Sequence, residues 1–311
     1  MGVFDGHSDL LYDVAHRRSN GERRVLERYH LNLLRQGDVE GLVLSLWAHP
    51  EEKETYAQAT EKLLCYAKEE FAECPWLRLV RTAAEAEQAK LDGKIYAFLG
   101  VEGMAAIGRN LAGIDRYADF GARMGMLTWN EENALATGAG GDSQNGLTEL
   151  GKEAVRRMQR RGMLVDVSHL NDGGFADVIR QTEGPVIASH SNCRALCDVR
   201  RNLTDDQLRA IRDTGGVVGI NVYHNFVHAD PEKQSIEMLC RHVCRMAEIM
   251  GVEYVACGFD FCGYFDPDGI GPKGLEDAAG IRRFFDCLGC FGMSLREREM
   301  IARENFLRVL T

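Results

Sequence analysis

The chain has 311 residues, of which 45% are hydrophobic and 27% are charged, a composition typical of a globular protein with a large core. Its formal net charge is −10 at pH 7, which argues against a nucleic-acid or anionic-membrane surface because both are bound by clustered Lys and Arg. We therefore expect a small-molecule partner, no nucleic acid and no membrane.

The first residues contain no basic segment followed by an apolar one, and no run approaches the ~20 apolar residues of a membrane span. We expect a cytoplasmic protein. The chain contains ten cysteines, and in a reducing compartment they are expected to be free thiols rather than disulfides. Cys287 and Cys290 form the one Cys-x-x-Cys pair. Without a second pair at zinc-ribbon spacing, they are expected to be structural.

Short apolar runs alternate with longer amphipathic segments along the chain. The runs cover residues 2–7, 41–50, 77–81, 94–103, 124–130, 162–170, 185–191, 216–224 and 252–261. Helices are expected at 55–74, 82–91, 114–122, from about 147 onward, and at 172–181, 204–214, 234–250, 277–290 and 294–303. Apolar runs that alternate with helices indicate parallel strands covered on both faces.

Eight or nine such strands favour a (β/α)₈ TIM barrel, forming one catalytic domain over residues 1–311. An open, doubly wound sheet is the main alternative. No Gly-x-Gly-x-x-Gly or Gly-x-x-x-x-Gly-Lys-Ser/Thr motif directly follows any of these strands. The sequence therefore lacks the phosphate-binding loop of a dinucleotide-binding or P-loop protein.

Ionisable side chains stand at the ends of five of the predicted strands. They are His7, Asp9, Glu102, His169, His190 and Asp260. A single His at such a position is more often a turn residue, but in a barrel the carboxyl ends of all strands lie on one face, where active sites are built. Imidazole and carboxylate ligands without an obligatory thiolate suit Zn²⁺. One tetrahedral ion uses four ligands, and this set is larger. It therefore predicts two metals that share a bridging group and activate water.

The segments "FDGHSDL", "GVEG", "LVDVSH", "ASHS", "RRNL", "GFDF" and "ENFLRVL" resemble, in order and over the whole chain, the renal or membrane dipeptidases. These enzymes are a zinc-dependent branch of the amidohydrolase-like barrels. The resemblance implies that His7 and Asp9 bind one zinc and that His169 and His190 bind the other. It further implies that Glu102 bridges the two ions.

The same resemblance assigns roles to two further residues. Asp260 is expected to act as general base and acid for a hydroxide that bridges the metals and attacks the peptide bond. Arg201, in "VRRN", is expected to bind the terminal carboxylate of the substrate, with its neighbour Arg200 as the competing candidate.

Two positions depart from the family pattern. Trp129 replaces a His found in the animal enzymes, so oxyanion stabilisation is left to the second metal, to Asn130 or to another group. Trp129 is then a substrate contact or a core aromatic residue. Cys262 stands where a second Asp is common. Tyr12, Tyr223 and Phe226 follow strand ends and are expected to line side-chain pockets, with core packing as the alternative.

Together these features predict a binuclear zinc dipeptidase whose substrates include L-Xaa-D-Xaa dipeptides. One alternative is hydrolysis of another amide or ester, such as an N-acyl amino acid. Another is a non-catalytic relative that binds peptide or metal. A homodimer is compatible with such a barrel, although no segment of the sequence identifies an interface.

Overall fold

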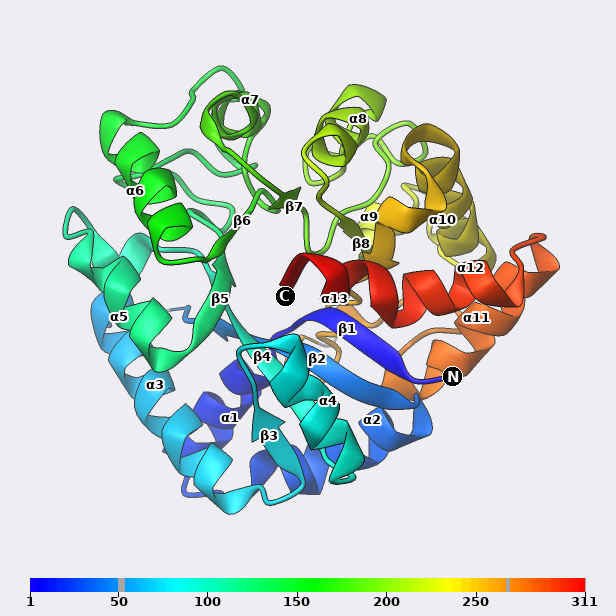
Figure 1. Ribbon diagram of the computed structural model, residues 1–311, viewed down its shortest axis with the longest axis horizontal. Coiled ribbons are helices and arrows are strands. Elements are labelled where there is room, and N and C mark those ends of the chain that lie inside the picture. The colour runs from blue at the N-terminus through cyan, green and yellow to red at the C-terminus, as the bar shows by residue number, and fades with distance from the viewer. Residues whose placement is uncertain (50–53, 267–268, 311) are drawn as a thin grey trace.

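A ring of parallel strands surrounded by helices forms the centre of the computed structural model, which describes residues 1–49, 54–266 and 269–310 (Figure 1). The strands are β1 Val3–Ser8, β2 Val39–Trp47, β3 Leu77–Leu79, β4 Ile95–Glu102, β5 Ala122–Gly125, β6 Leu164–Asp166, β7 Val186–Ile187, β8 Val218–Ile220 and β9 Val255–Cys257. Hydrogen bonding joins them in the order β1-β2-β4-β5-β6-β7, with β8 and β9 as a second parallel pair. The predicted barrel is therefore confirmed.

The barrel uses eight of these strands, and β3 is an addition to it. β3 pairs with the first residues of β4, whereas β5 pairs with the last residues along the same strand. A parallel bridge between Ala188 and Val218 connects β7 to β8. Between β9 and β1, the backbone N–H of Asp260 donates to the carbonyl of His7 at 3.3 Å. These two contacts continue the ring where the regular ladders stop.

The helices surround the ring of strands, apart from the last one, which lies across it (Figure 1). They are α1 Leu10–Ser19, α2 Leu31–Gln36, α3 Tyr56–Glu73, α4 Ala83–Leu91, α5 Ala112–Phe120, α6 Glu149–Arg160, α7 Asp172–Gln181, α8 Asp205–Asp213, α9 His224–Val227, α10 Ile236–Met250, α11 Ile281–Cys290, α12 Leu295–Glu299 and α13 Asn305–Leu310. The predicted starts of α3, α8 and α12 agree with the structure, where Thr55, Thr204 and Ser294 each form a capping box. Five predicted strands were too long. The runs at 124–130, 162–170, 185–191, 216–224 and 252–261 leave the regular ladder after Gly125, Asp166, Ile187, Ile220 and Cys257.

An inner apolar cluster fills the barrel below the functional face. Phe4, Phe98 and Ala256 belong to it, as does Phe306 of α13. The rings of Phe4 and Phe306 lie 5.5 Å apart, and Figure 1 shows α13 lying across the middle of the ring of strands. The C-terminal helix thus closes the amino end of the barrel and leaves the carboxyl end for the site.

Small residues lie in the strands between this core and the functional face. A Cβ on Gly219 would come within 1.9 Å of the Ser189 carbonyl oxygen, and one on Gly258 within 1.7 Å of the same atom. Only glycine allows the backbones of β7, β8 and β9 to approach so closely. This close approach brings the polar residues that follow these strands near one another.

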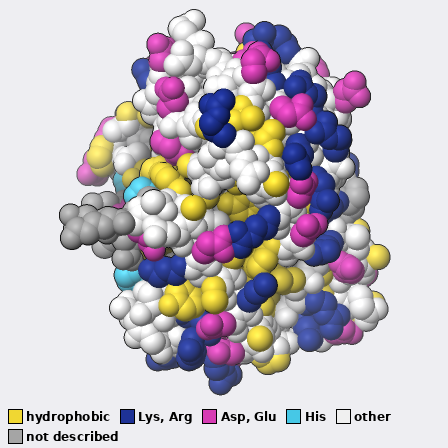
Figure 2. Space-filling view, turned by 90° about the vertical axis from the view of Figure 1, so that its left-hand side faces the viewer, with side chains coloured by type: hydrophobic (Ala, Val, Ile, Leu, Met, Phe, Trp, Pro, Cys, Tyr) yellow, Lys and Arg dark blue, Asp and Glu magenta, His cyan; other side chains and the backbone are white. Residues whose placement is uncertain are grey.

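Positive and negative side chains are interspersed on the face shown in Figure 2. Ion pairs join the helices on this side, with Arg116 of α5 bound to Glu61 of α3, and Arg157 of α6 bound to Asp115 of α5. Such exposed pairs each stabilise a protein by about 0–1 kcal/mol. No helix within the described ranges is long and apolar enough to cross a membrane.

Candidate metal centre

All five predicted metal ligands meet at the carboxyl end of the barrel. Oε2 of Glu102 lies 3.1 Å from Nε2 of His7, and Oε1 of the same carboxylate lies 2.8 Å from Nε2 of His169. Nε2 of His190 is 3.8 Å from Oε1, and Oδ1 of Asp9 is 3.5 Å from Nε2 of His7. Glu102 therefore stands between two groups of ligands, with one oxygen directed at each.

His169 and His190 direct their Nε2 atoms at this centre. Their Nε2 atoms lie 2.9 Å apart, while Nδ1 of His169 contacts Oδ1 of Asn130 at 2.9 Å and Nδ1 of His190 contacts the Ser189 hydroxyl at 2.8 Å. An amide oxygen accepts a hydrogen bond, so the ring proton of His169 belongs on Nδ1 and its Nε2 carries a lone pair. This is the arrangement in which a histidine binds a metal and donates its other N–H to a neighbour.

His7 and Asp9 supply further donor atoms to this centre. Nε2 of His7 and Oδ1 of Asp9 are buried and have no hydrogen-bond partner in the described structure. Asp9 stands at the N-cap of α1, yet its carboxylate does not cap the helix, although capping is the usual role of Asp there. His7, Asp9 and Asp260 place ligand atoms within 4.8 Å of one another, as do His7, Glu102 and His190. The donor set therefore fits divalent cations.

Burial controls the ionisation of the centre. Burial first, and the Asp9 charge second, raise the pKa of Glu102 to about 8. Burial lowers the pKa of His169 and of His190 well below the usual value. Burial would also lower the pKa of His7, but the Glu102 and Asp9 carboxylates raise it well above 6.5. Near neutral pH the centre therefore combines neutral rings at His169 and His190 with a protonated His7 and a carboxyl group at Glu102 that holds its proton, and a divalent cation would displace those protons.

Asp260 lies at the edge of the same centre. Its Oδ1 is 3.9 Å from Nε2 of His7, and its Oδ2 accepts a hydrogen bond from the side-chain amide of Asn221 at 3.0 Å. Burial first, together with the Asp9 charge, raises the pKa of Asp260 to about 7. Asp260 and His169 have φ angles of 60° and 69°, a left-handed conformation that is uncommon for non-glycine residues and that Arg24 and Asp38, away from the centre, also adopt.

Of the two neighbouring arginines, only Arg201 reaches the centre. Its side chain is buried, donates from Nη2 to the His190 carbonyl at 3.3 Å, and lies 5.4 Å from the ring centroid of Phe226. Its Nε has no hydrogen-bond partner in the described structure, and burial lowers its pKa to about 10. Arg200 instead donates to the Gly141 carbonyl at the surface.

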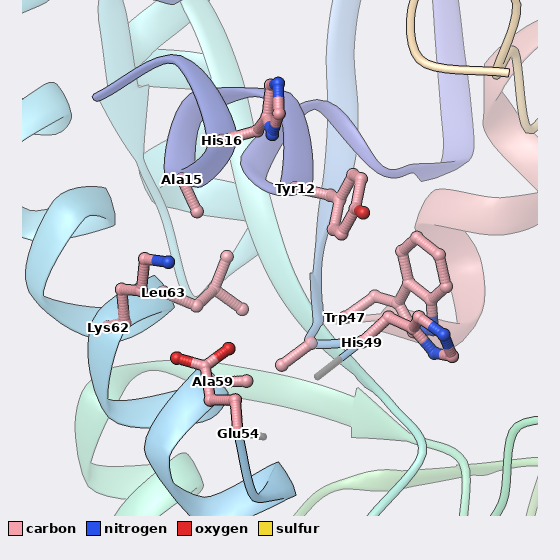
Figure 3. Close-up of a pocket in the computed structure, with 10 residues that line it drawn as sticks. Tyr12, Ala15, His16, Trp47, His49, Glu54, Ala59, Lys62 and Leu63 are labelled. Carbon is pink, nitrogen blue, oxygen red and sulfur yellow. The ribbon is translucent and has the colours of Figure 1, made fainter. Parts of the chain in front are cut away.

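Aromatic side chains extend from the centre to a neighbouring pocket. The ring of Trp129 lies 6.0 Å from that of His169 and 5.6 Å from Trp47, and Tyr12 lies 4.7 Å from Trp47. Figure 3 shows Tyr12, Trp47 and His49 along one side of a pocket, with Leu63 of α3 opposite. Trp129 is thus in ring contact with a predicted ligand.

The other predicted substrate contacts lie in different surroundings. Asn130, expected near the substrate, directs its side-chain oxygen at His169. The ring of Tyr223 lies 4.9 Å from that of Phe226, and Phe226 is the ring that faces Arg201. Cys262 is buried, and its thiol donates to the Gly269 carbonyl at 3.2 Å.

Sequence reasoning missed two side chains that contact the site carboxylates. Asn221 directly follows β8 and bonds Asp260, so it carries the same strand-end signal as the predicted ligands. Ser45 lies within β2, and its hydroxyl donates to Oε2 of Glu102 at 3.4 Å. A serine inside an apolar run offers no comparable signal.

Two sequence relatives cover much of the chain. An uncharacterized protein from the pqqA 5′ region of Klebsiella pneumoniae is 35% identical over 243 residues, which is 75% of this chain and 88% of that protein. An uncharacterized dipeptidase of Schizosaccharomyces pombe is 37% identical over 211 residues, which is 65% of this chain and 49% of that protein.

Solved structures share the fold over its full length. A dipeptidase described as a metallopeptidase of family M19 superposes with a TM-score of 0.90 at 25% identity, covering 100% of this chain and 98% of that one. A Rhodobacter sphaeroides metallopeptidase with a bound phosphinate mimic of L-Ala-D-Ala has a TM-score of 0.89 at 24% identity, covering 100% and 98%. The model of the membrane dipeptidase family matches residues 1–311. The resemblance seen in the sequence is thereby confirmed, and the chain belongs to the membrane dipeptidase family, peptidase family M19.

Proposed function

We propose that the protein hydrolyses dipeptides with two zinc ions held at this centre. His7 and Asp9 would hold one ion, His169 and His190 the other, and Glu102 both. The observation that supports this proposal most is that the two oxygens of Glu102 point at different ligands, Oε2 at His7 and Oε1 at His169. Imidazole and carboxylate donors suit zinc, and two ions sharing a carboxylate are a common hydrolytic arrangement.

Asp260 is the proposed general base and acid. Bound divalent ions would supply Lewis-acid polarisation of the scissile carbonyl and acidify the attacking water. Oδ1 of Asp260 faces the centre and would accept the proton of that water, then deliver it to the departing amine. Oδ2 is occupied by the Asn221 amide, which fixes the carboxylate so that one oxygen remains available.

Arg201 is the proposed ligand for the free carboxylate of the substrate. A planar guanidinium can bind a carboxylate through two parallel hydrogen bonds. The partnerless, buried Nε of Arg201 supports this role. Trp129, Tyr12 and Tyr223 are proposed to contact the substrate side chains. Because the Rhodobacter sphaeroides structure holds a mimic of L-Ala-D-Ala, L-Xaa-D-Xaa dipeptides are included in the proposed substrate range.

The experiment is a dipeptide panel combined with metal analysis. Protein purified with zinc is expected to contain two ions per chain and to cleave members of a panel of L,L and L,D dipeptides. Chelation should abolish turnover, and added zinc should restore it. A zinc-loaded protein that cleaves no member of the panel would refute dipeptide hydrolysis. Tight dipeptide binding without turnover would identify a binding protein instead.

Hydrolysis of another amide or ester, such as an N-acyl amino acid, is the second candidate. It is retained because Trp129 stands beside His169 at a position where the animal dipeptidases carry a His, which changes a group next to the proposed site of hydrolysis. Comparing N-acyl amino acids with dipeptides in one assay separates the two candidates. A preference of more than tenfold in kcat/KM for an N-acyl amino acid would replace the dipeptidase proposal.

A further inference from the structure

Two buried aspartates outside the ligand set, Asp5 and Asp166, make the same kind of contact below the metal centre. Asp5 lies on β1, two residues before His7, and Asp166 ends β6, three residues before His169. Their exposed fractions are 4% and 0%. Neither forms a salt bridge with a cation among the described residues, so ion pairing does not explain why these carboxylates are buried. Instead, one oxygen of each carboxylate accepts two backbone hydrogen bonds.

Asp5 joins the strand ends that carry His7 and Asp260. Its Oδ1 accepts from the backbone N–H of His7 at 3.3 Å and from that of Phe259 at 2.8 Å. Phe259 directly precedes Asp260, and within the described chain no regular ladder pairs β1 with β9. The carboxylate therefore supplies a connection at the point where the barrel lacks regular strand pairing.

Asp166 joins the strand ends that carry His169 and His190 in the same way. Its Oδ1 accepts from the N–H of Ser168 at 3.0 Å and from that of Ser189 at 3.1 Å. These serines directly precede the two histidines. β6 and β7 are only three and two residues long, and their pairing ends at Asp166 and Ile187. One carboxylate oxygen thus again holds two neighbouring strand ends together.

We propose that Asp5 and Asp166 are positioning residues, each of which sets the distance between two strand ends in one half of the metal centre. Asp5 serves the half with His7, Asp9 and Asp260, whereas Asp166 serves the half with His169 and His190. Each side chain accepts two N–H groups through one oxygen, so a single acceptor holds two strand ends together. The inference rests on the proposed function, because it takes His7, Asp9, His169 and His190 to be metal ligands.

The first experiment compares leucine and asparagine at each position. Asp5→Leu and Asp166→Leu remove the acceptor at similar volume and should each weaken one of two Co²⁺ binding events by about 10–100-fold, the usual effect of residues that orient ligands. Asp5→Asn and Asp166→Asn keep an acceptor oxygen and should bind both ions within about threefold of the wild type. Affinities are measured by calorimetry, and the visible Co²⁺ spectrum reports which half has changed.

Asn305→Leu is the matched control. Asn305 is buried and donates to the carbonyls of Val252 and Val255 at 2.7 Å each. These bonds hold the amino end of β9, which lies away from the site. This variant should lower the melting temperature and leave both Co²⁺ affinities unchanged. If either leucine variant binds both ions like the wild type, or if an asparagine variant loses as much affinity as its leucine counterpart, the inference is overturned.

A second experiment needs no variant. Hydrogen exchange of the wild-type protein after chelation should show protected amides at His7, Phe259, Ser168 and Ser189, because these bonds do not involve the metal. Exchange at these amides as fast as in exposed turns would overturn the inference even if the leucine variants do not fold. If the wild-type protein itself binds no Co²⁺, the proposed function fails. If the wild type and the leucine variants bind Co²⁺ equally well, the proposed function stands and only this inference fails.

Discussion

Nε2 of His169 and Nε2 of His190 lie 2.9 Å apart, and both face the same oxygen of Glu102. Two imidazole lone pairs repel each other at this distance unless a proton or a cation lies between them. Burial lowers the pKa of both rings, so each is neutral, and the 2.9 Å contact is either a hydrogen bond from one Nε2–H or two lone pairs directed at a cation.

Glu102→Gln should remove the second metal. The amide keeps the shape of the side chain but provides only one neutral oxygen, so we expect about one tightly bound ion per chain and a loss of about 1,000-fold in kcat, comparable to the loss of a strong transition-state stabiliser. Elemental analysis after dialysis checks the metal content. Glu61→Gln, at an exposed ion pair, is the control. Two tightly bound ions in Glu102→Gln would argue against a bridging role.

Asp260→Asn should abolish proton transfer and leave a folded protein. We expect kcat to fall by about 10²–10⁴-fold, the usual contribution of a general base, with a smaller effect on KM. Asn221→Ala frees Oδ2 of Asp260 and should lower kcat by about tenfold, as expected when a residue that orients a functional group is lost. Steady-state kinetics on one dipeptide separates the two effects. Full activity in Asp260→Asn would assign the base elsewhere.

The barrel and the clustering of the candidate ligands could be predicted from sequence, because residues at the carboxyl ends of the strands share one face. His7, Glu102 and His190 each follow or end an apolar run, so the fold alone brings them together. The contacts of Ser45, Asp5 and Asp166 could not be predicted in the same way. They depend on register and on the approach of neighbouring backbones, for example Asp5 with Phe259, 254 residues apart. The separate position of β3 also depends on pairing, since its sequence resembles that of the barrel strands.

Arg201→Ala should raise KM for dipeptides. Losing hydrogen bonds to a charged group costs about 1.5–3 kcal/mol, so kcat/KM should fall by about 10–150-fold. Arg200→Ala is the matched control and should change kcat/KM less than threefold, because its guanidinium bonds the Gly141 carbonyl at the surface. Equal effects of the two substitutions would contradict the assignment of Arg201 as the carboxylate ligand.

His242 should make the fold sensitive to acid. Its Nδ1 accepts from the Cys193 N–H at 3.1 Å and its Nε2 donates to the Val227 carbonyl at 2.8 Å, so only the neutral ring satisfies both contacts. Burial lowers its pKa to about 4. Between pH 6.5 and 4 the unfolded chain therefore binds more protons, and this residue should cost on the order of 3 kcal/mol of stability as the pH falls through that range.

Urea unfolding of the metal-free protein at several pH values checks this effect. His242→Gln removes the titrating group, so its stability should decrease less than that of the wild type between pH 6.5 and 4. His16→Gln, at a position outside the buried core, is the control and should follow the wild-type curve. Parallel curves for His242→Gln and the wild type would show that His242 does not carry the acid sensitivity.

Anomalous scattering at the zinc edge, measured from a crystal grown with zinc, tests the central claim most directly. We predict two peaks about 3.5–4 Å apart, the usual spacing of paired catalytic ions. One peak should lie beside His7 and Asp9 and the other beside His169 and His190, with Glu102 between them. A single peak, or two peaks that do not share Glu102, would contradict the binuclear centre.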